Sequence, residues 1–165
     1  MTTQQPASDY GVPTITTPQT AEHFDYYSSS LDVYLRSEQT GGQFFASRST
    51  VRPGDAPPFH VHTREDEIWI INSGEFRFWI GGDSLDSAET YDVGPGAMVY
   101  GPRNVAHTFQ ALSESGDVTI FWSPGGSQSY FLNVPSSDER EDFEHPERLT
   151  AIGVQVLDRA PVDGH

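Results

Sequence analysis

The sequence contains no cysteine and no lysine, and all nine of its basic residues are arginines. Without cysteine the protein can form no disulfide, offer no thiolate to a metal and use no cysteine nucleophile. Without lysine it can form no Schiff base with a carbonyl substrate and has no lysine general base. These two absences exclude the corresponding covalent mechanisms.

Positive charge is scarce throughout the chain. The nine arginines face 24 acidic residues, and the formal net charge is −15. This balance opposes binding to nucleic acid and to anionic membranes, because neutralising phosphate groups requires clustered cations. We therefore expect a small-molecule substrate, with no nucleic acid and no membrane as partner.

Long apolar runs are missing as well. The N-terminus has no basic segment followed by an apolar one, since the first arginine is Arg36. We expect neither a signal peptide nor a transmembrane span. The default expectation for the location is cytoplasmic.

Glycine, proline and aromatic residues are abundant: 15 glycines, 12 prolines and an aromatic share of 12%. This composition is typical of short strands joined by many turns, in a single domain. From Leu31 onward, strand patterns recur about every eight to twelve residues. They cover 31–36, 43–50, 58–62, 67–71, 75–80, 97–100, 105–111 and 118–122. The pattern predicts an all-β double sheet of the jelly-roll type.

The C-terminal part has a different character. Residues 146–153 predict one short helix, because proline suits the first helical position and Gly153 suits the stop. An apolar stretch, 154–157, predicts a final strand.

Four residues stand out as candidate metal ligands. His60 and His62 are two apart, so on a strand both side chains enter the same face. Glu67 follows a polar turn and opens an apolar run, and His107 follows a second turn that contains Pro102. Three imidazoles and one carboxylate suit a first-row divalent metal with open positions.

These residues resemble the cupin family. The first cupin motif has a glycine, five residues, His-x-His, three or four residues, a glutamate, six residues and a glycine. Each fixed position is present in this chain, as Gly54, His60, His62, Glu67 and Gly74.

The second cupin motif is matched by Gly96, Pro102 and His107. Asn104 replaces a glycine of the motif, which is a mild change because both residue types tolerate a positive φ. Ala111 replaces the final asparagine, which is not a ligand in the family. The resemblance covers about 31–123, and the C-terminal order is similar to that of quercetinase-like single cupins.

The resemblance implies a cupin jelly-roll β-barrel, or double-stranded β-helix, with a short C-terminal helix. With the lack of periodicity in 1–22, we expect a flexible arm (1–22), a barrel (23–135) and a tail that packs on the barrel (136–165). The resemblance also implies a homodimer, because related single cupins commonly pair through sheet edges.

Alternation along the strands extends the candidate site. Trp69 and Ile71 share the strand face of Glu67, and Val105 and Phe109 share that of His107, so we expect these four to line a substrate pocket. Around an open metal, such a lining favours a flat, apolar ligand. The two acidic residues before Glu67, Glu65 and Asp66, are interpreted as parts of a solvated turn.

Three functions remain open on this pattern. The first is a metal-dependent dioxygenase, similar to quercetinases, that cleaves an enolic or aromatic small molecule with O2. The second is a metal-dependent isomerase, cyclase or lyase that uses no O2. The third is a non-catalytic module that binds a small molecule.

The sequence leaves the metal itself open among Fe, Mn, Ni, Co and Zn, since all of them accept imidazole and carboxylate ligands. Glu67 is also the candidate catalytic residue, either as a ligand or as an unligated acid/base group.

Overall fold

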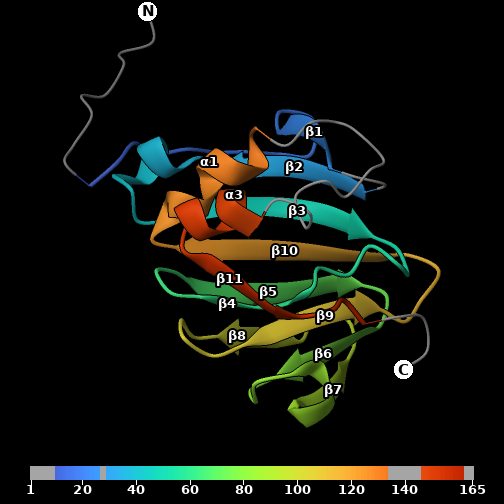
Figure 1. Ribbon diagram of the computed structural model, residues 1–165. Helices are drawn as coiled ribbons and strands as arrows, with labels where there is room; N and C mark the ends of the chain where they lie inside the picture. The colour runs from blue at the N-terminus through green and yellow to red at the C-terminus, as the bar shows by residue number, and fades with distance from the viewer. Residues whose placement is uncertain (1–9, 27–28, 134–145, 162–165) are drawn as a thin grey trace, which may run out of the picture.

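The computed structural model describes residues 10–26, 29–133 and 146–161, which form two antiparallel β-sheets with short helices at one end (Figure 1). The first sheet has six strands in the order β1-β2-β3-β10-β5-β8. Their bounds are β1 Glu22–Tyr26, β2 Ser29–Leu35, β3 Phe45–Val51, β10 Gly116–Ser123, β5 Asp66–Ser73 and β8 Met98–Gly101.

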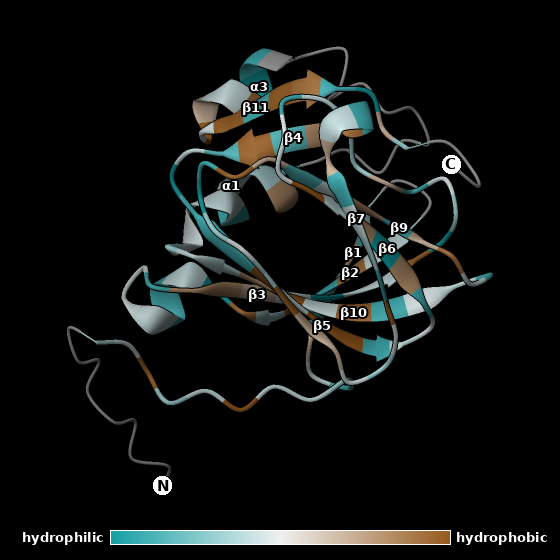
Figure 2. Ribbon diagram, turned by 90° about the horizontal axis from the view of Figure 1, so that it is seen from below, coloured by the Kyte–Doolittle hydropathy of each residue, from teal (hydrophilic) through white to brown (hydrophobic). Residues whose placement is uncertain are grey.

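The second sheet has five strands in the order β11-β4-β9-β6-β7. Their bounds are β11 Val154–Asp158, β4 Phe59–His62, β9 His107–Ala111, β6 Phe76–Ile80 and β7 Glu89–Val93. Seen from below, β3, β10 and β5 lie on one side of the barrel interior and β4 and β11 on the other (Figure 2).

Alternating side chains build the interior. On β10 the buried residues Val118, Ile120 and Trp122 alternate with partly exposed ones, and on β5 the buried residues Glu67, Trp69 and Ile71 do the same. Successive side chains of a strand point to opposite faces, so each sheet turns one apolar face inward. The continuous core between the sheets consists of Leu31, Val33, Phe45, Val51, Trp69, Ile71, Phe76, Phe78, Phe109, Ala111, Val118, Ile120 and Trp122.

The helices are short. The described residues include two α-helices, α1 Gln128–Phe131 and α3 Pro146–Ala151. They also include three 3-10 turns, η1 Ser37–Thr40, η2 Leu85–Ser87 and η3 Gly125–Ser127. No helix among these residues is long and apolar enough to cross a membrane.

The all-β jelly-roll prediction with a short C-terminal helix is confirmed, and the expected tail strand is β11, which pairs with β4 in the second sheet. Two strands were not predicted. The residues of β7 are nearly all exposed, and β1 is largely polar, so neither has the apolar alternation that marks a strand. Parts of the predicted arm (1–9), of the predicted barrel (27–28 and 134–135) and of the predicted tail (136–145 and 162–165) lie outside the described residues.

Candidate metal centre

The four candidate ligands come from three strands that belong to both sheets. His60 and His62 lie on β4, and His107 begins β9, where it is the register partner of His60. Glu67 lies on β5 of the opposite sheet and pairs with Gly101 and Trp122. All four side chains are at most 9% exposed. Closure of the barrel thus brings together residues that are up to 47 positions apart in the sequence.

One potential ligand atom from each residue lies within 4.8 Å of the other three. The His60 and His62 Nε2 atoms are 3.2 Å apart, and Glu67 Oε2 lies 3.1 Å from Nε2 of both His62 and His107. Ligand atoms bonded at about 2.0–2.2 Å to one first-row metal would lie about 3 Å apart in an octahedral and about 3.4 Å apart in a tetrahedral arrangement. The observed spacings therefore fit one ion.

Hydrogen bonds behind the rings orient the imidazoles. His60 Nδ1 lies 2.7 Å from the Pro58 carbonyl oxygen, and His107 Nδ1 lies 3.1 Å from that of Val105. A carbonyl oxygen can only accept, so both rings carry their proton on Nδ1 and turn the Nε2 lone pair toward the cluster. This is the tautomer that a metal requires from a histidine bound through Nε2.

Burial and mutual contacts shift the pKa values of three cluster residues in different directions. Burial lowers the pKa of His60 to about 3, helped by His107 and His62. Burial also acts to lower the pKa of His62, but hydrogen bonds with Glu65 and Glu67 outweigh it and raise that pKa to about 9. For Glu67, burial acts to raise the pKa, but hydrogen bonds from the His107 and His62 rings, in the state in which each carries a proton on Nε2, reverse this and hold the pKa well below its usual range.

Two Nε2 lone pairs at 3.2 Å would repel each other unless a proton or another cation lies between them. A divalent cation would satisfy both imidazoles and the Glu67 carboxylate at once. The donor set of three nitrogens and one carboxylate oxygen suits a first-row transition metal. These four residues can therefore hold a metal ion.

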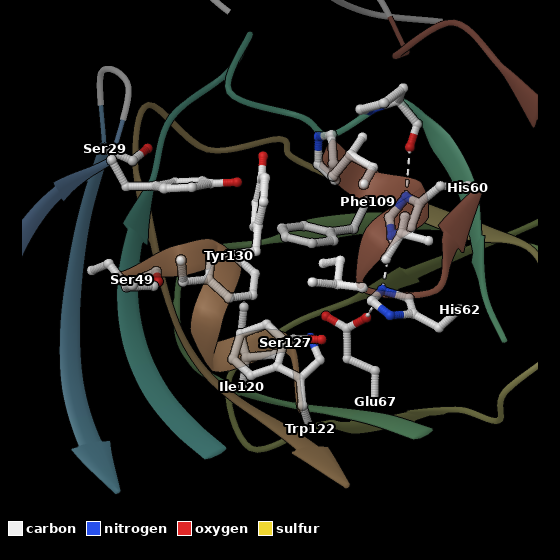
Figure 3. Close-up of a pocket in the computed structure, with 18 of the residues that line it drawn as sticks. Ser29, Ser49, His60, His62, Glu67, Phe109, Ile120, Trp122, Ser127 and Tyr130 are labelled. Atoms are coloured by element: carbon white, nitrogen blue, oxygen red, sulfur yellow. Dashed lines mark hydrogen bonds and ion pairs between the residues drawn. The ribbon is translucent and has the colours of Figure 1, made fainter. Parts of the chain in front are cut away.

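A cavity opens directly on the cluster, and His60, His62 and Glu67 form part of its wall. Figure 3 shows these residues on one side of the cavity, with Ser29, Ser49 and Tyr130 on the other. The wall is mainly apolar and aromatic, and among the described residues that form it there is no arginine. Its aromatic members are Tyr26, Phe109, Trp122, Tyr130 and Phe131.

Of the four predicted pocket residues, Phe109 lines this cavity, whereas Trp69, Ile71 and Val105 do not. Trp69 and Ile71 do point into the barrel, but they are fully buried in the packed core. The Trp69 ring lies edge-on to His107, with ring centroids 5.0 Å apart, so it supports the ligand from behind. Val105 precedes β9 and supplies the carbonyl oxygen next to His107 Nδ1.

Several residues of the site could not be read from the motifs. Trp122, Ser127, Tyr130 and Phe131 come from the end of β10 and from the segment that follows it. A tyrosine and a phenylalanine in a polar stretch carry no sequence signal for a cavity wall. Only the packing of α1 across the open end of the barrel brings them there.

Glu65 corrects one expectation. It was interpreted as part of a solvated turn, but it is 2% exposed and lies beside His62. The cause is a contact across 62 positions, because Ser127 of η3 covers the carboxylate. Asp66 does point away from the cavity, and it pairs on the surface with Arg103 at 3.0 Å.

Comparison with known proteins defines the class of this fold and site. Residues 47–124, which include all four cluster residues, match the Cupin domain family. Residues 47–124 are thus a cupin domain, as the motifs indicated.

The chain is 27% identical to the quercetin 2,3-dioxygenase of Aspergillus japonicus over an alignment of 113 residues. The alignment covers 60% of this chain but only 32% of the length of that relative.

Two solved structures share the fold. KdgF from Halomonas sp. has a TM-score of 0.58 at 18% identity, covering 68% of this chain and 94% of that one. A Streptomyces Pac13 variant solved with uridine has a TM-score of 0.57 at 15% identity, covering 91% of this chain and 94% of that one. At these identities the likeness is one of fold alone.

Proposed function

We propose that this protein is a metal-dependent dioxygenase, similar to the quercetinase-like cupins, that cleaves an enolic, aromatic small molecule with O2. The observation that supports this most is the aromatic cavity whose wall includes His60, His62 and Glu67 of the four-residue cluster and, among the described residues, no arginine. An anionic substrate would lack a cationic partner there, whereas a flat and largely apolar substrate would pack well against the aromatic wall. The similarity to quercetin 2,3-dioxygenase supports the same reading.

The four cluster residues would hold the ion in this enzyme. When bound, a divalent transition metal supplies stabilisation for an ionised substrate hydroxyl and a template for the oxygen reaction. Glu67 lines the cavity, so it is the cluster residue suited to accept the hydroxyl proton of a substrate. The backbone carbonyl groups of Pro58 and Val105 keep the His60 and His107 rings turned toward the cluster.

The walls orient the substrate. The rings of Trp122 and Phe131 pack with centroids 4.7 Å apart, and Phe109 lies between the ligands and the far side of the cavity (Figure 3). Aromatic faces favour offset or tilted packing against another ring, and they exclude water from the reacting centre. The hydroxyl groups of Ser29 and Ser49 lie at the opposite end, where they can receive a polar group of the substrate.

A second candidate is a metal-dependent lyase or isomerase that uses no O2. It is favoured by the carboxylate of Glu67, which lies 3.1 Å from two imidazoles and can pass a proton without oxygen chemistry. The Pac13 fold neighbour is described as a nucleoside dehydratase, which is a reaction of this class. Because that likeness is one of fold alone, this function stands second.

The test compares aerobic with anaerobic turnover. The purified protein is loaded separately with iron, manganese, nickel, cobalt and zinc and offered a panel of flavonols and enolisable diketones. We expect oxygen uptake and incorporation of isotopic oxygen into the cleaved product. Equal turnover without oxygen would replace the dioxygenase by the lyase or isomerase, and tight binding with no turnover would leave a binding module.

A further inference from the structure

Glu65 is a buried carboxylate that the proposed mechanism does not use. Its Oε2 atom accepts a hydrogen bond from Ser127 Oγ at 2.6 Å and lies 3.4 Å from His62 Nδ1. Both Glu65 and Ser127 are at most 2% exposed. One carboxylate oxygen therefore touches a candidate metal ligand on one side and the segment after β10 on the other.

His62 differs from the other two histidines in what lies behind its ring. His60 and His107 each face the backbone carbonyl of the residue two positions earlier, which their own strand and its turn hold in place. The acceptor at His62 is a side chain. Its position depends on the remote segment Gly125–Phe131, which we call the C-terminal wall.

The C-terminal wall closes tightly on Glu65. A Cβ atom on Gly126 would lie 2.7 Å from Glu65 Oε1, so the backbone of the wall passes directly over the carboxylate. From the same wall, Ser127, Tyr130 and Phe131 line the cavity. A contact to Glu65 is therefore also a contact that places the cavity wall.

We propose that Glu65 is a positioning residue that joins the metal ligand His62 to the C-terminal wall, so that metal binding and the ordering of this wall stabilise each other. The proposal rests on the proposed metal centre. A carboxylate that accepts from the outer nitrogen of a bound histidine orients the ring and raises its basicity, and its loss typically costs about 10–100-fold in metal affinity. Coupling between metal binding and wall ordering is reciprocal, so loss of the contact between Glu65 and Ser127 must weaken metal binding, and a bound metal must protect the wall.

The chain offers a matched control on the outer side of the same wall. Gln128 Oε1 accepts from the Ser37 backbone N–H at 2.6 Å, and its Nε2 donates to Glu38 Oε2 at 2.7 Å. Gln128 does not line the cavity, and these two hydrogen bonds point its side chain toward Ser37 and Glu38 rather than toward Glu65. Its removal takes away two outer contacts of the wall and leaves the contacts from Ser127 through Glu65 to His62 in place.

The experiment measures Co²⁺ binding by chelator competition and by visible absorption, on the full chain and its variants. We expect Glu65→Ala to weaken Co²⁺ binding about 10–100-fold, with a smaller loss for the isosteric Glu65→Gln and for Ser127→Ala. Gln128→Ala should bind Co²⁺ as the wild type does. In hydrogen exchange, Co²⁺ should protect the amides of 125–131 in the wild type and lose this effect in Glu65→Ala.

The outcomes separate the two proposals. Equal Co²⁺ affinity in wild type, Glu65→Gln and Ser127→Ala would overturn the positioning role and leave the metal centre standing. An equal loss in Gln128→Ala and Ser127→Ala would also overturn it, because general rigidity of the wall would then be the cause. A wild-type protein that binds no Co²⁺, or any other divalent metal, would overturn the metal centre itself.

Discussion

At the scale of single residues, the site combines three neutral donors with one charged donor. His60, His62 and His107 differ in what lies behind each ring, yet all three turn Nε2 toward the same point. Each imidazole would therefore contribute directly to holding an ion, whereas Glu67, which lines the cavity with His60 and His62, would also serve as a proton acceptor. The two kinds of residue should respond differently to substitution.

Loss of two imidazoles should abolish metal binding. In the His60→Ala, His107→Ala double variant only one nitrogen and one carboxylate remain, which are too few protein ligands for a stable site. We expect most of the metal content to disappear, as measured by elemental analysis of the purified protein. His23→Ala is the control, because His23 is an exposed residue that pairs with Asp32 at 2.7 Å. Full metal content in the double variant would show that the metal binds elsewhere.

Glu67→Gln should separate metal binding from turnover. The amide oxygen can still lie among the imidazoles, but it is a poor proton acceptor. We expect retained metal and a turnover rate lower by about 100-fold or more, which is the usual contribution of a general base. Glu75→Gln, at an exposed position, serves as the control. Turnover at the wild-type rate with full metal would exclude Glu67 as the base.

At the scale of elements, the edge strand β8 shapes the metal centre from behind. A Cβ atom on Gly101 would lie 2.8 and 2.9 Å from two ring carbons of Trp69 and 3.2 Å from His107 Nδ1. Glycine is needed here because the strand must pass close to both rings. The indole in turn packs edge-on to the His107 ring.

Gly101→Ala should therefore disturb both stability and metal binding. Overpacking at a closely packed position costs about 1–3 kcal/mol of unfolding free energy, and displacement of His107 should weaken metal binding as well. Denaturant unfolding of the metal-free protein and metal titration measure the two effects. Gly94→Ala is the matched control, because its Cβ would meet only a side-chain oxygen at 3.8 Å. Unchanged metal affinity in Gly101→Ala would show that His107 does not depend on this packing.

Among the elements, the sequence predicts best the strands that carry the candidate metal ligands. The strands that carry His60, His62, Glu67 and His107 have clear apolar alternation and fixed motif spacing, and the structure brings all four together. β7 was missed because its side chains are exposed, so no alternation marks it. Glu65 was misread because its cover, Ser127, comes from a segment whose position only the closed barrel defines. The alternation of side chains along a strand predicts which of them point inward, but it does not separate the side chains that line the cavity from those that fill the core.

At the scale of the whole molecule, an apolar area is exposed on the outside of the first sheet. Met98 and Tyr100 on β8 are 67% and 55% exposed. They pair in register with Ile70 and Ile68 on β5, and on the other side of β5 Ile68 pairs with Phe121 on β10. We call these five residues the outer stripe. It adjoins the edge of the sheet that ends at β8, where a second copy of the chain could cover it.

We predict that the protein is a homodimer that buries the outer stripe. The net charge of −15 repels two copies over most of their surface, so an apolar area is where contact is least unfavourable. The double variant Met98→Asp, Tyr100→Asp should be a monomer with unchanged metal content, because neither residue lies at the metal centre. Tyr91→Asp is the control, since Tyr91 is 48% exposed on β7, at the edge of the other sheet. Light scattering over a range of concentrations measures the mass, and a wild-type mass near 18.3 kDa at every concentration would refute the dimer.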